Sequence, residues 1–131
     1  MPTRYQQLRQ AIANLAAPAA EQRSYLESFF ARYGSPLPPD FNTDELGLEF
    51  GDMYLATGDM LECGEISQKE IDAARPLDTL LGKWSGKQDG DFWTVGALFD
   101  DARWDEVRQL AAEALACYPD EVRECEFTKR V

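Results

Sequence analysis

Histidine is absent from this chain of 131 residues. Without an imidazole the chain has no Ser-His-Asp or Cys-His arrangement to activate a nucleophile, no histidine-ligated zinc and no Glu-x-x-His di-iron site. Glycine-rich phosphate loops are also missing, because neither GxGxxG nor GxxxxGK[ST] occurs. We therefore expect a protein that is not an enzyme and has no cofactor.

Long apolar runs are missing as well. No run approaches the length of about 18 residues that a membrane helix needs, so we expect no contact with the membrane. The first seven residues lack the apolar centre of a signal peptide. The chain has three cysteines, Cys63, Cys117 and Cys125, and their spacing forms no CxxC motif. We expect reduced cytoplasmic thiols, two of them packed in the protein. The alternative is a reactive thiol, which needs nearby cations to lower its pKa.

Positive charge is missing from one long stretch. Between Arg32 and Lys69 the chain has no basic residue and eight acidic ones. Residues 40–105 contain sixteen acidic and five basic residues, so this region alone has the net charge of -11 of the whole chain. A concentrated acidic surface repels nucleic acid and anionic membranes and attracts basic proteins.

Alanine and leucine are abundant, and long runs of valine and isoleucine are absent. This composition favours helix over sheet and predicts an all-α fold, a compact bundle of five or six helices. The length predicts one domain over 1–131. Within it we expect a helical pair (1–34), a proline-rich loop (35–43), an acidic helical region (44–118) and a tail of undecided structure (119–131).

Capping boxes mark two helix starts, Thr3-x-x-Gln6 and Ser67-x-x-Glu70. Pro76 follows the second start and predicts a kink or a helix in two pieces. Apolar residues at helical spacing predict four buried faces. The faces are Tyr5, Leu8, Ile12 and Leu15; Gln22, Leu26, Phe29, Phe30 and Tyr33; Leu77, Leu80, Leu81 and Trp84; and Trp104, Val107, Leu110, Ala111, Ala114, Leu115 and Tyr118.

The acidic stretch predicts one helix from Asp44 to about Cys63, ended by Gly64. Its apolar side contains Leu46, Phe50, Met53, Tyr54 and Leu61, within an arc of about 100°. Four carboxylates fall within an adjacent arc of about 80°. These four residues, which we call the acidic stripe, are Glu45, Glu49, Asp52 and Asp59. Gly47, Gly51 and Gly58 make this helix intrinsically weak, so either tertiary packing holds it or it breaks near one of these glycines.

The acidic stripe predicts a docking surface for a basic partner, since a merely solvated helix face usually mixes both signs of charge. Tyr54, Trp93 and Asp91 are further candidate binding residues, with Trp93 as an exposed aromatic anchor beside acidic groups. The loop Asp89-Gly90-Asp91 lacks the spacing of a calcium loop, so we expect no metal site.

Three parts of the C-terminal half resemble helical bacterial immunity proteins of contact-dependent inhibition systems. They are Leu80-Leu81-Gly82-Lys83-Trp84-Ser85-Gly86, then Phe92-Trp93-Thr94 with Ala97-Leu98, and Trp104-Asp105-Glu106-Val107-Arg108. The resemblance covers about a third of the chain, and no partner-contacting residue carries over from it. Immunity proteins are small, acidic and cytosolic, and they bind and neutralise a toxin domain.

The resemblance and the charge together lead us to expect a non-catalytic inhibitor of a basic toxin domain, present as a monomer or weak homodimer. An oligomeric adaptor or assembly subunit, in which the acidic face serves solubility alone, is the first alternative. A carboxylate- or metal-dependent hydrolase, built on a pair such as Glu49 and Asp52, is the second.

Overall fold

The computed structural model describes residues 2–32, 43–85 and 87–125. These residues form seven α-helices and one 3-10 helix and no β-strand, which confirms the predicted all-α fold. None of these helices is long and apolar enough to cross a membrane. The elements are α1 (Arg4–Ala16), α2 (Ala19–Arg32), α3 (Asp44–Leu55), α4 (Thr57–Glu62), α5 (Gln68–Lys83), η1 (Lys87–Trp93), α6 (Val95–Asp100) and α7 (Ala102–Leu115).

Both predicted capping boxes are present. Thr3 Oγ1 accepts a hydrogen bond from the Gln6 backbone at 3.2 Å, and the Gln6 side chain accepts one from the Thr3 backbone at 2.9 Å. Ser67 and Glu70 make the same reciprocal pair at the start of α5. These bonds satisfy backbone donors that a helix leaves unpaired at its first turn. Local sequence therefore determines where α1 and α5 begin.

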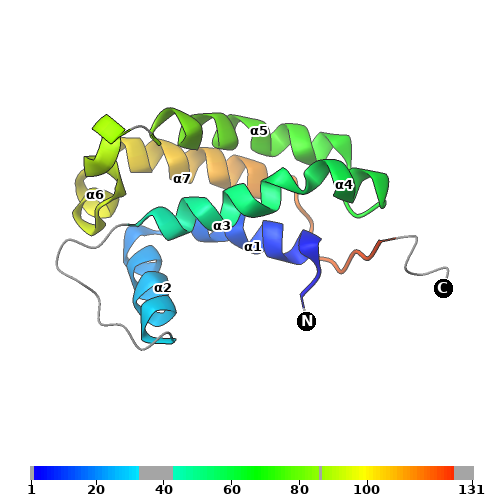
Figure 1. The fold of residues 1–131 in the computed structure, drawn as a ribbon, viewed down its shortest axis with the longest axis horizontal. Coiled ribbons are helices and arrows are strands. Elements are labelled where there is room, and N and C mark those ends of the chain that lie inside the picture. The colour runs from blue at the N-terminus through cyan, green and yellow to red at the C-terminus, as the bar shows by residue number, and fades with distance from the viewer. Residues whose placement is uncertain (1, 33–42, 86, 126–131) are drawn as a thin grey trace.

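α1, α3, α5 and α7 lie side by side, and α2 runs across their direction at one end (Figure 1); their buried residues form one core. α1 lies against both α3 and α7, α7 also packs on α5, and α2 packs against α6. All four residues predicted for the buried face of α1 are fully buried, as are Trp104 and Val107 of α7. In α2, Gln22 and Leu26 are buried, whereas the side chain of Phe30 and all of residues 33–42 lie outside the described part of the chain.

The predicted helix from Asp44 to Cys63 is not continuous, and of the two alternatives it breaks, two residues before Gly58. The helix is interrupted at Ala56, whose backbone N–H donates to the Met53 carbonyl at 3.1 Å, three residues back instead of four. The buried Thr57 hydroxyl donates to the Tyr54 carbonyl at 2.7 Å, so a side chain replaces part of the helical hydrogen bonding there. α3 and α4 are consequently separate helices, and Gly64, at φ 78, ends α4 as predicted.

Of the two outcomes predicted at Pro76, a kink or a helix in two pieces, the second does not occur, because α5 continues from Gln68 to Lys83. Proline removes the hydrogen bond that would reach the Asp72 carbonyl. Both Pro76 and Asp72 lie on the exposed side of α5, so water can satisfy that carbonyl. The missing bond is therefore tolerated within a continuous helix.

Candidate functional site

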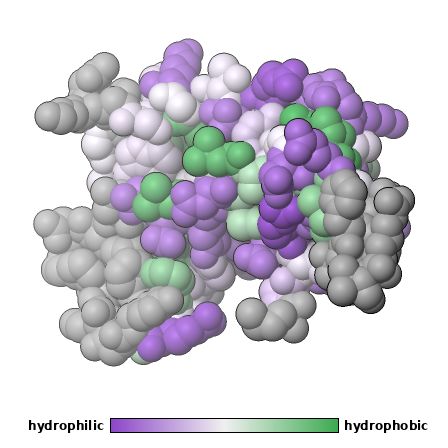
Figure 2. Space-filling model, turned by 45° about the vertical axis from the view of Figure 1, so that its right-hand side comes forward, coloured by the Kyte–Doolittle hydropathy of each residue, from purple (hydrophilic) through white to green (hydrophobic). Residues whose placement is uncertain are grey.

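Two grooves flank α3. The first, which we call the glycine groove, has a volume of about 560 Å³ and lies between α3, α5 and η1. The second, which we call the carboxylate groove, has a volume of about 330 Å³ and lies between α1, α2 and α3. On the face shown in Figure 2, the described surface is mostly hydrophilic, with hydrophobic residues in separate patches. α3 is thus the element that presents most of the candidate binding residues.

Three members of the acidic stripe follow one side of α3. Asp52 is exposed, and Glu49 and Asp52 both line the carboxylate groove beside Asn14 and Tyr25. Glu49 is half buried and accepts a hydrogen bond from the Tyr25 hydroxyl of α2. This bond places the Glu49 carboxylate at the groove. Glu49 therefore joins α3 to α2 and also contributes negative charge to the groove.

Asp59 is separated from the rest of the stripe, because it lies on α4. Its carboxylate accepts from the Arg4 guanidinium at 2.7 Å, and Arg4 also pairs with the buried Glu65. The sequence shows no Lys or Arg interleaved with the stripe. Asp59 nevertheless has a partner from a distant element, because Arg4 of α1 pairs with it as well as with Glu65.

The remaining carboxylates of α3 repel one another. Burial raises the pKa of Glu45, and the neighbouring charges of Glu49, Asp44 and Asp52 raise it further. A raised carboxyl pKa means that the ionised form is less favourable in the folded protein than in the unfolded chain. The repulsion between the carboxylates of α3 therefore disfavours the folded state, and a cationic partner would relieve that repulsion.

Tyr54 and Asp91 both make contacts inside the fold. The Tyr54 hydroxyl donates to the Ile71 carbonyl of α5 at 2.9 Å, and its ring stacks on Phe50. Asp91 keeps an exposed side chain, yet it pairs with Arg103 at 3.0 Å. Asp91 thus remains on the surface near the glycine groove, whereas Tyr54 mainly joins α3 to α5.

Trp93, predicted as an exposed anchor, is half buried instead. Its ring packs edge-on against Phe92 and Trp104, and its indole N–H donates to the Trp84 carbonyl at 2.9 Å. All three tryptophans of the protein therefore belong to one aromatic cluster. One edge of Trp93 still lines the glycine groove, so the side chain forms part of a wall and does not project.

Sequence reasoning did not find the glycine groove. Its lining includes Gly47 and Gly51 on α3, Gly82 on α5 and the half-exposed Leu48, with Asp44 and Asp78 adding charge. The sequence feature that could have indicated the groove is the presence of glycines at helical positions, where glycine is an unfavourable residue. A Cβ on Gly47 would lie 2.9 Å from the Trp93 ring, so glycine there permits close packing of α3 against η1.

Gly51→Ala is expected to raise the free energy of unfolding by about 0.5–1 kcal/mol, because alanine is the better helix former. A Cβ at this position meets no atom within 4 Å. Gly47→Ala is the matched control, and there the clash with Trp93 should cancel or reverse the gain. Urea unfolding of both variants measures the difference, and equal stabilisation of the two would contradict this account of the groove.

A scan against models of protein families matches none of them, and searches of curated proteins and of solved structures also return no match. The chemistry of the two grooves consists of carboxylates, amide side chains and an apolar wall, groups that can pair with cationic side chains and contact aliphatic ones. Among the described residues, one group has atoms close enough to share a metal ion, namely Cys63, Glu65 and Cys125, which lies outside both grooves.

Proposed function

We propose that this protein is a cytoplasmic, non-catalytic inhibitor that binds a basic protein, as an immunity protein neutralises a toxin domain. One observation carries the proposal: α3 and α4 contain carboxylates and no Lys or Arg, and on α3 they lie beside two grooves. The mutual repulsion that raises the pKa of Glu45, after the effect of burial, supports a surface shaped for a cationic partner.

The mechanism that this surface supports is occlusion. Lysine and arginine side chains of the partner would pair with the carboxylates of α3, and apolar side chains would enter the glycine groove. Long-range attraction between the acidic surface and a basic domain speeds association, up to about 10⁸–10⁹ M⁻¹s⁻¹ at low salt. Rapid capture matters for an inhibitor that must act before its target does damage.

Charge reversal at the carboxylate groove is expected to slow association by about tenfold or more at low salt. The double variant Glu49→Gln with Asp52→Lys suits this test, because a glutamine oxygen can still accept the Tyr25 hydroxyl. Folding stability should change by no more than about 0.5 kcal/mol. The partner to use is the product of the reading frame immediately upstream, with association rates measured over a range of salt concentrations.

Glu106→Lys with Glu113→Gln is the matched control, since it changes the charge equally at exposed positions of α7 that line neither groove. The control should associate like the unmodified protein. Association that is indifferent to salt, or equally slow in both variants, would contradict the proposal. So would a failure of this protein to protect cells that produce the upstream protein.

Self-association is the second candidate function, and two exposed leucines favour it. Leu55 is 86% exposed and Leu48 is 51% exposed, both on α3. An adaptor could join two copies through these side chains. Light scattering distinguishes the two functions. A dimer that persists in high salt and is lost in the variant Leu55→Ser supports the adaptor. A monomer supports the inhibitor.

A further inference from the structure

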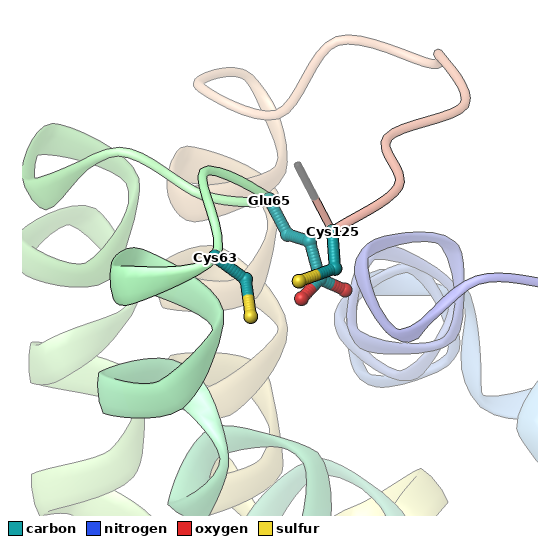
Figure 3. Close-up of side chains that lie close together, drawn as sticks. All are labelled: Cys63, Glu65 and Cys125. Atoms are coloured by element: carbon teal, nitrogen blue, oxygen red, sulfur yellow. The ribbon is translucent and has the colours of Figure 1, made fainter. Parts of the chain in front are cut away.

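Two thiols and one carboxylate from distant parts of the chain meet at the end of α4. The ligand atoms of Cys63, Glu65 and Cys125 all lie within 4.8 Å of one another. Cys63 directly follows α4, Glu65 follows the turn at Gly64, and Cys125 belongs to the C-terminal segment. Figure 3 shows the three side chains directed into one space between these two segments.

The C-terminal segment is held where Cys125 can reach this space. Arg123 pairs with the buried Glu70 of α5, and its guanidinium lies 4.1 Å from the centre of the Tyr5 ring. The Tyr5 hydroxyl also donates to the Pro119 carbonyl at 3.0 Å. Residues 119–125 form neither helix nor strand, so these contacts, and not a regular element, position the second thiol.

The carboxylate of this group is fixed as well. Glu65 is 3% exposed, and both of its oxygens accept from the Arg4 guanidinium. A carboxylate has about four acceptor positions, so Arg4 leaves Glu65 further positions for a ligand. Carboxylates that bind a metal are commonly oriented by such an outer hydrogen bond, which makes Arg4 a positioning residue.

The charge balance favours a cation at this place. Two carboxylates, those of Asp59 and Glu65, share the single guanidinium of Arg4, and two ionisable thiols lie beside Glu65. A bound divalent cation would allow both thiols to ionise.

We propose that Cys63, Glu65 and Cys125 bind a thiophilic divalent cation, Zn²⁺ being the ion that two thiolates and a carboxylate fit best. Zinc takes sulfur ligands at about 2.3 Å and carboxylate oxygens at about 2.0–2.2 Å, usually with four ligands in total. Three protein ligands leave one position for water. Binding releases one proton from each thiol to the solvent and ties the C-terminal segment to α4, independently of the acidic grooves.

The test uses the full chain, reduced and freed of metal, titrated with Zn²⁺ in competition with a chromophoric chelator. One zinc ion should bind per chain, and Co²⁺ in its place should give the near-ultraviolet absorption of thiolate-to-cobalt charge transfer. Cys125→Ser should lower the zinc affinity by more than about 100-fold, since even the loss of an outer-shell partner lowers affinity 10- to 100-fold. Cys63→Ser should do the same.

Cys117→Ser is the matched control, because Cys117 is an exposed thiol outside the group and its loss should leave zinc affinity unchanged. Cys125 lies outside the helices, so Cys125→Ser should keep the helical circular dichroism signal and remain informative if Cys63→Ser misfolds. Equal zinc affinity in all variants would overturn the proposal. A reduced protein that takes no zinc, yet forms a Cys63–Cys125 disulfide with glutathione disulfide, would show a redox pair and overturn it too.

Discussion

Trp104→Ala is expected to lower the free energy of unfolding by about 3–5 kcal/mol, the typical loss for a buried tryptophan. Trp104 is fully buried and stacks on Phe92, with ring centres 4.6 Å apart. Its indole N–H donates to the Phe92 carbonyl at 2.6 Å, and the variant leaves that carbonyl without its donor. Since a domain of this size is stable by about 5–15 kcal/mol, the variant should be partly unfolded or close to it.

Urea unfolding followed by far-ultraviolet circular dichroism measures this loss. Trp104→Phe keeps an aromatic ring against Phe92 but removes the N–H, so its loss should be clearly smaller than that of Trp104→Ala. Trp84→Ala is the control within the same cluster, because Trp84 is only half buried. Equal losses for Trp84→Ala and Trp104→Ala would contradict the larger contribution that full burial predicts for Trp104.

Glu70→Ala is expected to lower the free energy of unfolding by about 2–4 kcal/mol, because it removes one partner of a largely buried ion pair. Glu70 is 4% exposed and accepts hydrogen bonds from Arg123, from the Tyr5 hydroxyl at 2.9 Å and from the Ser67 backbone at 2.9 Å. One carboxylate thus joins the start of α5, α1 and the C-terminal segment. Its loss should release that segment as well as weaken the helix start.

The same residue predicts a dependence on pH. Burial alone would raise the pKa of Glu70, but the hydrogen bonds from Arg123, Ser67 and Tyr5 outweigh burial and lower it below its ordinary value of 4.5. A lowered carboxyl pKa contributes stability that is present above the unfolded-state pKa and is lost as the pH falls through the folded-state pKa. The unmodified protein should therefore lose stability below about pH 4.5, the ordinary carboxyl range.

Unfolding of the unmodified protein and of Glu70→Gln, measured from neutral pH downwards, tests this dependence. Glutamine keeps the capping box with Ser67 but cannot ionise, so the variant should start less stable and lose less on acidification. Glu106→Gln on α7 is the control for an exposed carboxylate. If Glu70→Gln loses as much stability in acid as the unmodified protein, the hydrogen bonds of Glu70 are not the cause of the loss of stability at low pH.

Much of the fold could be predicted because its signals are local. The capping boxes at Thr3 and Ser67, the stop at Gly64 and the buried face of α1 depend on residues three or four positions apart, and all are present in the structure. A break near one of the glycines of the acidic stretch was one of two alternatives, but its position at Ala56 was not predicted. It rests on the buried Thr57, and burial depends on what α4 packs against.

The candidate site was predicted only in part. The position of Glu49 and Asp52 on one side of a helix follows from helical spacing, and the structure places both at the carboxylate groove. Helical spacing did not predict the pairing of Asp59 with Arg4 or the half burial of Trp93. Each depends on a contact between two different elements of the fold. The glycine groove was missed for the same reason, since its walls come from α3, α5 and η1.

By itself the sequence determined the helical class, the ends of several helices and the concentration of negative charge between Arg32 and Lys69. These properties arise from composition and from contacts within one or two turns of helix. Only the tertiary structure decided which carboxylates are paired and that Cys63 lies beside Cys125. Such contacts depend on how side chains of different helices fill space and exclude water, which spacing along the chain does not specify.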